Sequence, residues 1–374
     1  MHPRMAGQGV FRQAPAVHPL LLPLVRLRND ATLIARGAAA RLGRPDAPWK
    51  LTLALTWVCE QRCTHCRIWR RPLGEELSAA EWDHVFQRLG DQLSWVDLTG
   101  GEVTSRDDFA AIAQSVVARC PRLALLHFPT NGRDPARVER AAQDIVRARP
   151  TRLIVSISLD GPPALHDRLR GDDGAFASAI ETYRRLRALN IETYFGMTLS
   201  SYNATRVDET VEAIASHVPG FAHRDLHVNL IHISPHFFQN QPIEDRARSP
   251  EVDEALAAFT AARGVPRGPT ALLEALYLAH VPRYLETGRS PLPCGSLSVN
   301  AFVDPAGTVF PCHIWDRPLG VLADYDWDLA RVWALAETRA ARQEIVAERC
   351  PGCWTPCEAY PTVLSNLDRA VLAA

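Results

Sequence analysis

Three cysteines, Cys59, Cys63 and Cys66, lie within a stretch of eight residues. The stretch follows an apolar, alternating run over 51–58, a pattern that indicates a β-strand, so the thiols are expected in the loop after a strand end. Three thiolates fill three corners of an iron–sulfur cube and leave its fourth iron open, whereas four would saturate it. A structural zinc site would likewise need four closed ligands. The spacing therefore predicts a cluster with one iron available to a further ligand.

The thiols follow the first of several predicted strands. From residue 51 the sequence alternates between strand and helix patterns, and Ser78 to Glu81 form a capping box at the start of a helix. The predicted strands are 51–58, 95–99, 123–129, 153–159, 193–199 and 226–233, and the predicted helices are 78–93, 106–120, 135–147, 175–189 and 208–217. This alternation implies parallel strands joined by right-handed crossovers. We therefore expect the α/β class, with a partial (β/α)6 TIM-like barrel whose functional residues lie at the carboxyl ends of its strands.

Glycine and polar residues follow the next three predicted strands in order. They are Gly100, Gly101, Glu102, Asn131, Ser158, Asp160 and, slightly further on, Arg170. Glycine lets the backbone approach a ligand because it has no Cβ atom, and arginine can pair with a carboxylate through its planar fork. Their ordered placement after the thiols indicates one binding site at the mouth of the barrel rather than a set of unrelated turns.

The cysteine spacing and these motifs resemble the radical S-adenosylmethionine (SAM) superfamily over roughly residues 50–360. The resemblance implies a [4Fe–4S] cluster on the three cysteines, with SAM chelating the open iron. It also implies that Gly100, Gly101 and Glu102 hold the amino group of SAM. Val103 stands where the family usually has a proline, which is a small departure.

The resemblance also assigns the remaining strand-end residues. Ser158 and Asp160 would bind the ribose hydroxyls, and Arg170 the SAM carboxylate. His65 occupies a position beside the adenine in the family, although it could be a plain loop histidine. Asn131 is either part of the site or simply the first residue of an asparagine–glycine turn.

The activity that the resemblance implies is radical chemistry. A reduced cluster passes one electron to SAM, which breaks into methionine and a 5′-deoxyadenosyl radical, and this radical takes a hydrogen atom from a substrate. The electron would come from a donor such as flavodoxin or ferredoxin. The sequence shows no triad of nucleophile, acid and base, which agrees with a reaction whose chemistry is supplied by cofactors.

A second group of cysteines follows residue 290, and the stretch 303–312 is typical of a β-hairpin that delivers one of them. The group resembles the SPASM and Twitch extensions of radical SAM enzymes, which hold auxiliary [4Fe–4S] clusters. Four thiols saturate one cluster, so we expect one auxiliary cluster on Cys294, Cys312, Cys350 and Cys353. Cys357 is then a substitute ligand, a reactive thiol or a small buried residue. A zinc ion bound by four thiolates is the alternative.

The sequence says little about the substrate. Alternation along the sixth strand puts Asn229 on one face and His232 on the other, and both are candidates for orienting or deprotonating a substrate, with a structural role as the alternative. A single auxiliary cluster favours oxidation or rearrangement of a small molecule. The alternative is maturation of a ribosomally made peptide through a crosslink, thioether or epimer. A zinc- or iron-binding module without catalysis would leave the Gly-Gly-Glu motif unexplained.

Composition narrows the remaining classes. The net charge of −1 over 374 residues gives no electrostatic reason to bind nucleic acid. No apolar run is long enough to span a membrane, and Met1 to Val10 lack the apolar core of a signal peptide. Nine cysteines, mostly in two groups with metal-ligand spacing, indicate the reducing cytoplasm rather than disulfides. Cys120 is expected to be a packing residue. The single lysine, Lys50, lies outside any motif and is not expected to form a Schiff base.

We expect three parts of the chain, a helical extension over 1–49, the barrel over 50–290 and the auxiliary cluster domain over 291–374. In the extension, Asn29 and Asp30 are predicted to cap a helix from Ala31 to Leu42. This helix either packs on an end of the barrel or binds a membrane surface through its basic residues.

Overall fold

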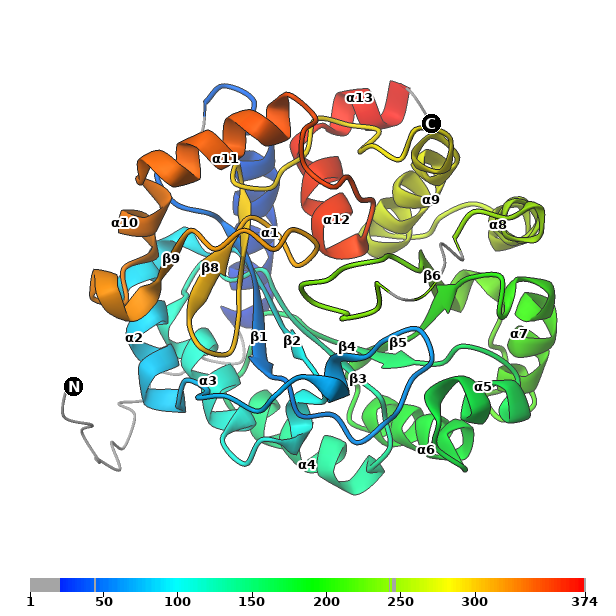
Figure 1. The fold of residues 1–374 in the computed structure, drawn as a ribbon. Helices are drawn as coiled ribbons and strands as arrows, with labels where there is room; N and C mark the ends of the chain where they lie inside the picture. The colour runs from blue at the N-terminus through cyan, green and yellow to red at the C-terminus, as the bar shows by residue number, and fades with distance from the viewer. Residues whose placement is uncertain (1–20, 44, 242, 244–246, 373–374) are drawn as a thin grey trace.

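The computed structural model describes residues 21–43, 45–241, 243 and 247–372. In this part of the chain one open, nine-stranded sheet runs in the order β6-β5-β4-β3-β2-β1-β7-β8-β9 (Figure 1). The strands are β1 Lys50–Thr56, β2 Trp95–Gly100, β3 Leu125–Thr130, β4 Leu153–Ser158, β5 Glu192–Leu199, β6 Leu226–Leu230, β7 Asn300–Val303, β8 Thr308–Phe310 and β9 Gly320–Val321. The strands β1 to β6 are parallel, which confirms the predicted α/β class and partial barrel.

Helices cover the outside of the curved sheet (Figure 1). The helices of the described residues are α1 Leu22–Ala39, α2 Ala79–Leu89, α3 Phe109–Arg119, α4 Pro135–Arg147, α5 Pro163–Arg170, α6 Ala175–Ala188, α7 Val207–Ala215, α8 Pro250–Arg263, α9 Pro269–Thr287, α10 Leu329–Trp333, α11 Ala336–Val346, α12 Pro356–Ser365 and α13 Leu367–Leu372. The capping box predicted at Ser78 and Glu81 is present at the start of α2. In the described residues, no helix combines the length and the apolar character that crossing a membrane requires.

The two faces of the sheet differ in polarity, as alternation along each strand requires. On β1, Leu51, Leu53 and Leu55 are fully buried and belong to the core that includes Trp82 and Phe86 of α2. Lys50 and Thr52 alternate with these leucines, and on their face of the sheet Lys50 contacts both Thr52 and Asp97 of β2. The sheet therefore has a dry outer face that stabilises the fold and a polar inner face that leads to the strand ends.

The C-terminal hairpin is joined to the same sheet. The strand β7 pairs in parallel with β1, from Lys50 opposite Asn300 to Leu53 opposite Val303. The strands β7 and β8 are antiparallel and confirm the predicted hairpin. The segment 291–374, which was predicted as an auxiliary domain, therefore extends the barrel sheet past β1. The order of strands and helices in the sequence does not indicate that β7 pairs with β1.

The N-terminal helix differs from its prediction. The helix α1 begins at Leu22, so Asn29 lies inside it and does not cap a helix starting at Ala31. The Asn29 side chain is buried, and its amide donates to the carbonyls of Leu123 and Pro121 at 2.9 and 3.2 Å. At Gly37, an added Cβ would lie 2.6 Å from the carbonyl oxygen of Leu364, so glycine permits close packing on α12. The predicted absence of a signal peptide in Met1 to Val10 concerns residues outside the described range.

Candidate functional site at the barrel mouth

The structure places Cys59, Cys63 and Cys66 in the loop that leaves the carboxyl end of β1. Cys63 is buried, and the other two thiols are half-buried. Burial, and after it the neighbouring Cys63, raise the pKa of Cys59 to about 12. The same two influences raise the pKa of Cys66 to about 12. The three thiols thus lie close enough to affect one another's titration, as a common metal centre requires, and loading such a centre must displace their protons.

The thiol loop is fixed by the end of α5. The amides of Arg62 and Thr64 donate to the carbonyls of Arg170 and Leu169 at 3.0 and 2.8 Å. Gly171 ends α5 with a φ of +59°, and a Cβ there would lie 2.8 Å from the carbonyl oxygen of Arg62. A larger residue at this position would therefore push the loop away from α5.

Gly100 and Gly101 hold the same loop from the side of β2. The amides of Gly101 and Glu102 donate to the carbonyls of Thr56 and Val58, each at 2.8 Å. A Cβ on Gly100 would lie 2.2 Å from the Thr56 oxygen, and one on Gly101 would lie 2.0 Å from the Val58 oxygen. The sequence assigned these glycines to a close approach of SAM. In the structure these glycines allow the end of β2 to pack closely against the chain immediately before Cys59, whether or not SAM is bound.

Glu102 is a buried link between neighbouring strand ends. Its Oε1 atom accepts hydrogen bonds from the hydroxyls of Thr104 at 2.6 Å and Thr130 at 2.9 Å. Its Oε2 atom accepts from the amide of Asn131 at 2.7 Å. The side chain of Asn131 bonds to the amide of Arg133 at 2.9 Å, which forms the asparagine–glycine turn. The carboxylate thus joins β2 to β3, a structural task in addition to the predicted contact with SAM.

Asp160 and Arg170 form a buried ion pair beside the thiols. The Arg170 Nη2 atom lies 2.7 Å from Asp160 Oδ2, and its Nη1 atom lies 3.7 Å from the sulfur of Cys63. Burial by itself would raise the pKa of Asp160, but Arg170 lowers it below its ordinary value. The Nε atom of Arg170 is buried and has no hydrogen-bond partner among the described residues. Arg170 therefore still offers a donor to an anionic group placed next to Cys63.

Two further predicted residues lie near this pair. His65 Nε2 is 3.9 Å from Asp160 Oδ2, and burial lowers the pKa of His65, which favours the neutral ring. Ser158 is half-buried at the end of β4, opposite Gly196 of β5. The structure therefore brings the residues predicted around SAM to one end of the barrel.

The surroundings of His232 favour the structural alternative, and its catalytic role stays a prediction. Its ring is buried, and Nε2 accepts a hydrogen bond from the amide of Trp354 at 3.1 Å while Nδ1 faces the carbonyl of Leu230 at 2.9 Å. Both ring nitrogens are therefore engaged with the backbone, and the histidine anchors the segment next to Cys353. Asn229 is half-buried opposite Thr198 on the other face of β6, so its predicted role stays a prediction.

Four thiols of the second group line one cavity of about 570 Å³. Cys294 precedes β7, Cys312 follows β8, and Cys350 and Cys353 lie between α11 and α12. Burial raises the pKa of Cys294 to about 12, and the pKa values of Cys312 and Cys353 lie well above the ordinary range. Cys357 does not line this cavity. The four predicted ligands are thus brought together, and the predicted spare thiol is not among them.

The spacing of the thiols also bears on zinc. Zinc bound at about 2.3 Å by tetrahedral thiolates needs its sulfurs within about 4 Å of one another. Among the described residues, neither cysteine group brings three ligand atoms within 4.8 Å of one another. A four-iron cluster accepts more widely spaced sulfurs because each thiolate binds a different iron. As their side chains lie, the described residues of neither cysteine group present the close ligand set of a single zinc ion.

A buried polar chain was missed by the sequence interpretation. Lys50 is fully buried, and its Nζ atom lies 2.8 Å from Asp97 Oδ2. Asp97 Oδ1 is 3.1 Å from His127, whose Nε2 is 2.9 Å from the hydroxyl of Ser156. Lys50 also donates to the carbonyl of Cys357 at 2.8 Å. The sequence does contain an indication of this pair. Its only lysine, Lys50, lies at the start of β1, and an aspartate, Asp97, lies on the same face of the next strand.

One loop after β6 touches both cysteine regions. The Asn240 amide donates to the carbonyl of His65 at 2.9 Å. The hydroxyl of Ser234 lies 3.2 Å from the carbonyls of His313 and Ile314, beside Cys312. Cys59 and Cys66 pack against an aromatic cluster made of Trp57, Phe237, Phe302 and Phe310, with Ala54 and Ile68. The loop therefore fixes the two sites relative to each other.

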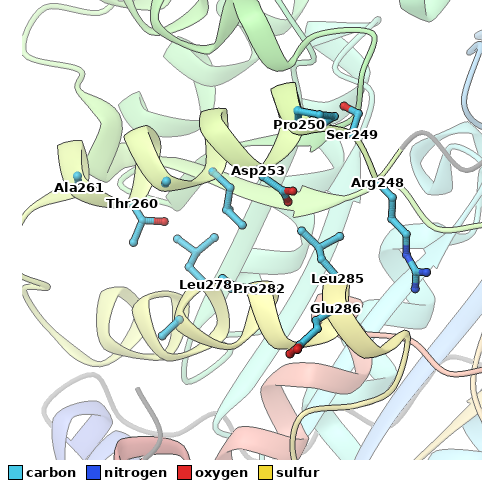
Figure 2. A pocket seen from close by; sticks show the side chains of 13 residues that line it. Arg248, Ser249, Pro250, Asp253, Thr260, Ala261, Leu278, Pro282, Leu285 and Glu286 are labelled. Carbon is cyan, nitrogen blue, oxygen red and sulfur yellow. The ribbon is translucent and has the colours of Figure 1, made fainter.

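A separate groove of about 980 Å³ runs between α8 and α9, as Figure 2 shows. Its walls carry Leu278, Pro282 and Leu285, with Asp253, Glu286 and Arg248 at its rim. None of the predicted site residues lines it.

Residues 54–214 match the family model of the radical SAM superfamily. The sporulation killing factor maturation protein SkfB of Bacillus subtilis is 30% identical over 171 residues, which cover 45% of this chain and 40% of SkfB. The mycofactocin maturase MftC of Mycobacterium ulcerans is 27% identical over 333 residues, which cover 82% of this chain and 80% of MftC. The structure of anSMEcpe with bound AdoMet superposes with a TM-score of 0.59 at 14% identity, covering 87% of this chain and 99% of that one. The chain thus spans less than half the length of SkfB but four fifths of MftC.

Proposed function

We propose that this chain, whose residues 54–214 match the family model of the radical SAM superfamily, is a radical SAM enzyme that binds a [4Fe–4S] cluster through Cys59, Cys63 and Cys66 and cleaves SAM reductively. The observation that carries the proposal is the gathering of these three thiols in one loop at the carboxyl end of β1. When bound, the cluster and SAM supply an electron and a 5′-deoxyadenosyl radical that removes hydrogen from a substrate.

The protein's own part is to bind and orient SAM. The backbone of Gly100 and Gly101 stands beside the thiol loop, where its polar groups can meet the amino group of SAM. Arg170 has a buried, unpartnered Nε atom next to Cys63, which suits the carboxylate of SAM. Ser158 and Asp160 end the neighbouring strand and are assigned to the ribose, with His65 beside the adenine.

The four thiols of the second cavity are proposed to hold an auxiliary [4Fe–4S] cluster. Cys294, Cys312, Cys350 and Cys353 saturate such a cluster, so it has no open iron for SAM. A saturated cluster supplies one-electron transfer, and with it the chain would carry out a net oxidation. An external donor such as flavodoxin or ferredoxin would reduce the first cluster.

The proposed substrate is a peptide, and the proposed reaction is its maturation. Support comes from MftC, a maturase that aligns over four fifths of both chains, and from SkfB, a maturation protein. This reverses the order of substrate classes expected from the cysteine count. Oxidation or rearrangement of a small molecule is the second candidate. Four thiols line the second cavity, which is enough for one auxiliary cluster, and a single auxiliary cluster favours a small-molecule substrate.

Anaerobic purification followed by reduction in the presence of SAM tests the proposed function. We expect about eight irons per chain, and formation of 5′-deoxyadenosine and methionine from SAM. Release of neither product by an enzyme fully loaded with iron would contradict the proposal. Adding short peptides encoded beside this gene, with product mass as the readout, then decides between the two substrate classes.

A further inference from the structure

His313, Cys357 and Glu358 bring three ligand atoms of different kinds together at the edge of the second cysteine cavity, which Glu358 also lines. One nitrogen of His313, the sulfur of Cys357 and one oxygen of Glu358 all lie within 4.8 Å of one another. The Nδ1 atom of His313 is 2.9 Å from Glu358 Oε2. This is the spacing that a single metal ion requires, and neither cysteine cluster group has it.

The burial of these groups indicates that something is missing between them. His313 is 3% exposed and Glu358 2%. The Oε1 atom of Glu358 is buried and has no hydrogen-bond partner among the described residues. Burying an unpaired carboxylate oxygen costs free energy, because the oxygen has lost its water without gaining a donor.

The charges around the group favour a divalent cation. Lys50 and Asp97 form an ion pair with each other, so they balance one another. Burial raises the pKa of the Cys357 thiol, so the thiol is neutral without a metal, and Glu358 is in contact with His313. A metal ion that displaces the thiol proton would meet two negative charges, one on Cys357 and one on Glu358. One divalent ion balances both, and the cluster proposed beside Glu358 would be anionic and would supply no positive charge.

The surroundings resemble the outer shell of a metal site. The hydroxyl of Thr355 donates to Glu358 Oε2 at 2.7 Å and orients the carboxylate. The ring of His313 lies against Phe237 and Phe302, with ring centroids 5.4 and 6.4 Å apart. Hydrogen bonds that orient ligands and an apolar wall that excludes water are both usual around bound metals.

We propose that His313, Cys357 and Glu358 bind one zinc ion, separate from both iron–sulfur clusters. A set of imidazole, thiolate and carboxylate ligands suits zinc, whose fourth position a water molecule would fill. Binding converts the Cys357 thiol to a thiolate, and its proton passes to solvent. The ion would tie the chain after β8 to the start of α12, the two segments next to Cys312 and Cys353.

Metal counts on the anaerobically purified full chain, supplied with iron and Zn²⁺, test the site. We expect one zinc per chain besides the iron. Cys357→Ala should lose the zinc and keep the iron, and Thr355→Val, which removes only the orienting hydroxyl, should raise the dissociation constant for Zn²⁺ about tenfold. Cys120→Ala, a buried thiol far from the group, should keep both metals.

X-ray absorption at the zinc edge then identifies the ligands. One sulfur with nitrogen and oxygen neighbours supports the proposal, whereas four sulfurs would mean that zinc occupies the second cysteine cavity. The proposal is also overturned if the wild type binds no zinc, or if Cys357→Ala loses iron and so reveals a cluster ligand. SAM cleavage by the wild type reports separately on the proposed function, which can fail while the zinc site stands.

Discussion

Cys59, Cys63 and Cys66 come from one loop, whereas the thiols of the second cavity come from three segments of the chain. The first loop is held by backbone hydrogen bonds to β1, β2 and α5, so its shape depends on geometry at one end of the barrel. The second group forms only when β7, β8 and the approach to α12 have docked together. We conclude that the first site is sensitive to single changes at its glycines, and the second to packing throughout the C-terminal region.

The largest expected effect comes from removing each group in turn. The triple replacement of Cys59, Cys63 and Cys66 by Ala should abolish SAM cleavage and lower the iron from about eight to about four per chain. Replacing Cys312 and Cys353 by Ala should remove a similar amount of iron and yet leave SAM cleavage measurable. Iron analysis and 5′-deoxyadenosine formation are the two measurements. If the second variant also loses all cleavage, the sites are not separately assembled.

A smaller effect is expected at the glycines. Gly101→Ala puts a Cβ 2.0 Å from the carbonyl oxygen of Val58, so the chain before Cys59 must move. We expect SAM cleavage to fall at least about tenfold, which corresponds to about 1.4 kcal/mol. Gly74→Ala is the matched control, because no atom lies within 4 Å of a Cβ added there. Equal activity of the two variants would show that the close approach does not shape the site.

The polar chain on the inner face joins the barrel strands to Cys357 of α12, and Lys50 contacts both Asp97 and the Cys357 carbonyl. Lys50→Met leaves Asp97 buried without its partner, and we expect the free energy of unfolding to fall by about 3–5 kcal/mol. Chemical denaturation measures the change. The double variant Lys50→Met with Asp97→Leu removes both charges and should recover part of the loss. A double variant as unstable as the single one would contradict the role of the ion pair.

The same pair predicts a pH dependence. Burial by itself would raise the pKa of Asp97, but Lys50 and His127 lower it below the ordinary value. The stability from this carboxylate is therefore present above its unfolded pKa of about 3.9 and is lost as the pH falls through the lower folded pKa. The difference in unfolding free energy between wild type and Lys50→Met should be constant near neutral pH and shrink below about pH 4. A difference that grows on acidification would refute this account.

A smaller loss of stability than at Lys50 is expected at His232. His232→Ala leaves the buried amide of Trp354 without its acceptor, at a cost of about 1–3 kcal/mol. We expect partial loss of iron from the second site with SAM cleavage unchanged. His223→Ala, which removes a histidine paired with an exposed aspartate, is the control. Intact iron and stability together with loss of substrate conversion would instead support the predicted catalytic role of His232.

The sequence predicted most of what depends on local pattern. The six parallel strands, the capping box at Ser78 and the positions of both cysteine groups follow from periodicity and spacing. The start of α1 was wrong because Asn29, a good helix cap in isolation, is used to bond the carbonyls near Leu123. Such a contact joins residues far apart in sequence, and no local pattern encodes it.

The sequence predicted which residues would form the candidate site, but it did not predict the contacts between them. Glu102 was expected near SAM, but its partners Thr104 and Thr130 depend on how two strand ends meet. Lys50 was set aside because it lies outside any motif, and only the register of β1 against β2 reveals its pairing with Asp97. In both cases a polar side chain that the sequence could place on a strand found its partner through sheet packing.

The parallel pairing of β7 with β1 also covers a strand edge that could otherwise pair with another chain. Every residue of β1 is buried, and β7 covers the edge that the six barrel strands leave open on that side. Without β7 this edge would present free amide and carbonyl groups beside an apolar row of leucines, which is a template for pairing with other chains. The C-terminal region therefore protects the barrel against aggregation, so a chain shortened before Asn300 should precipitate even though its first three cysteines are intact.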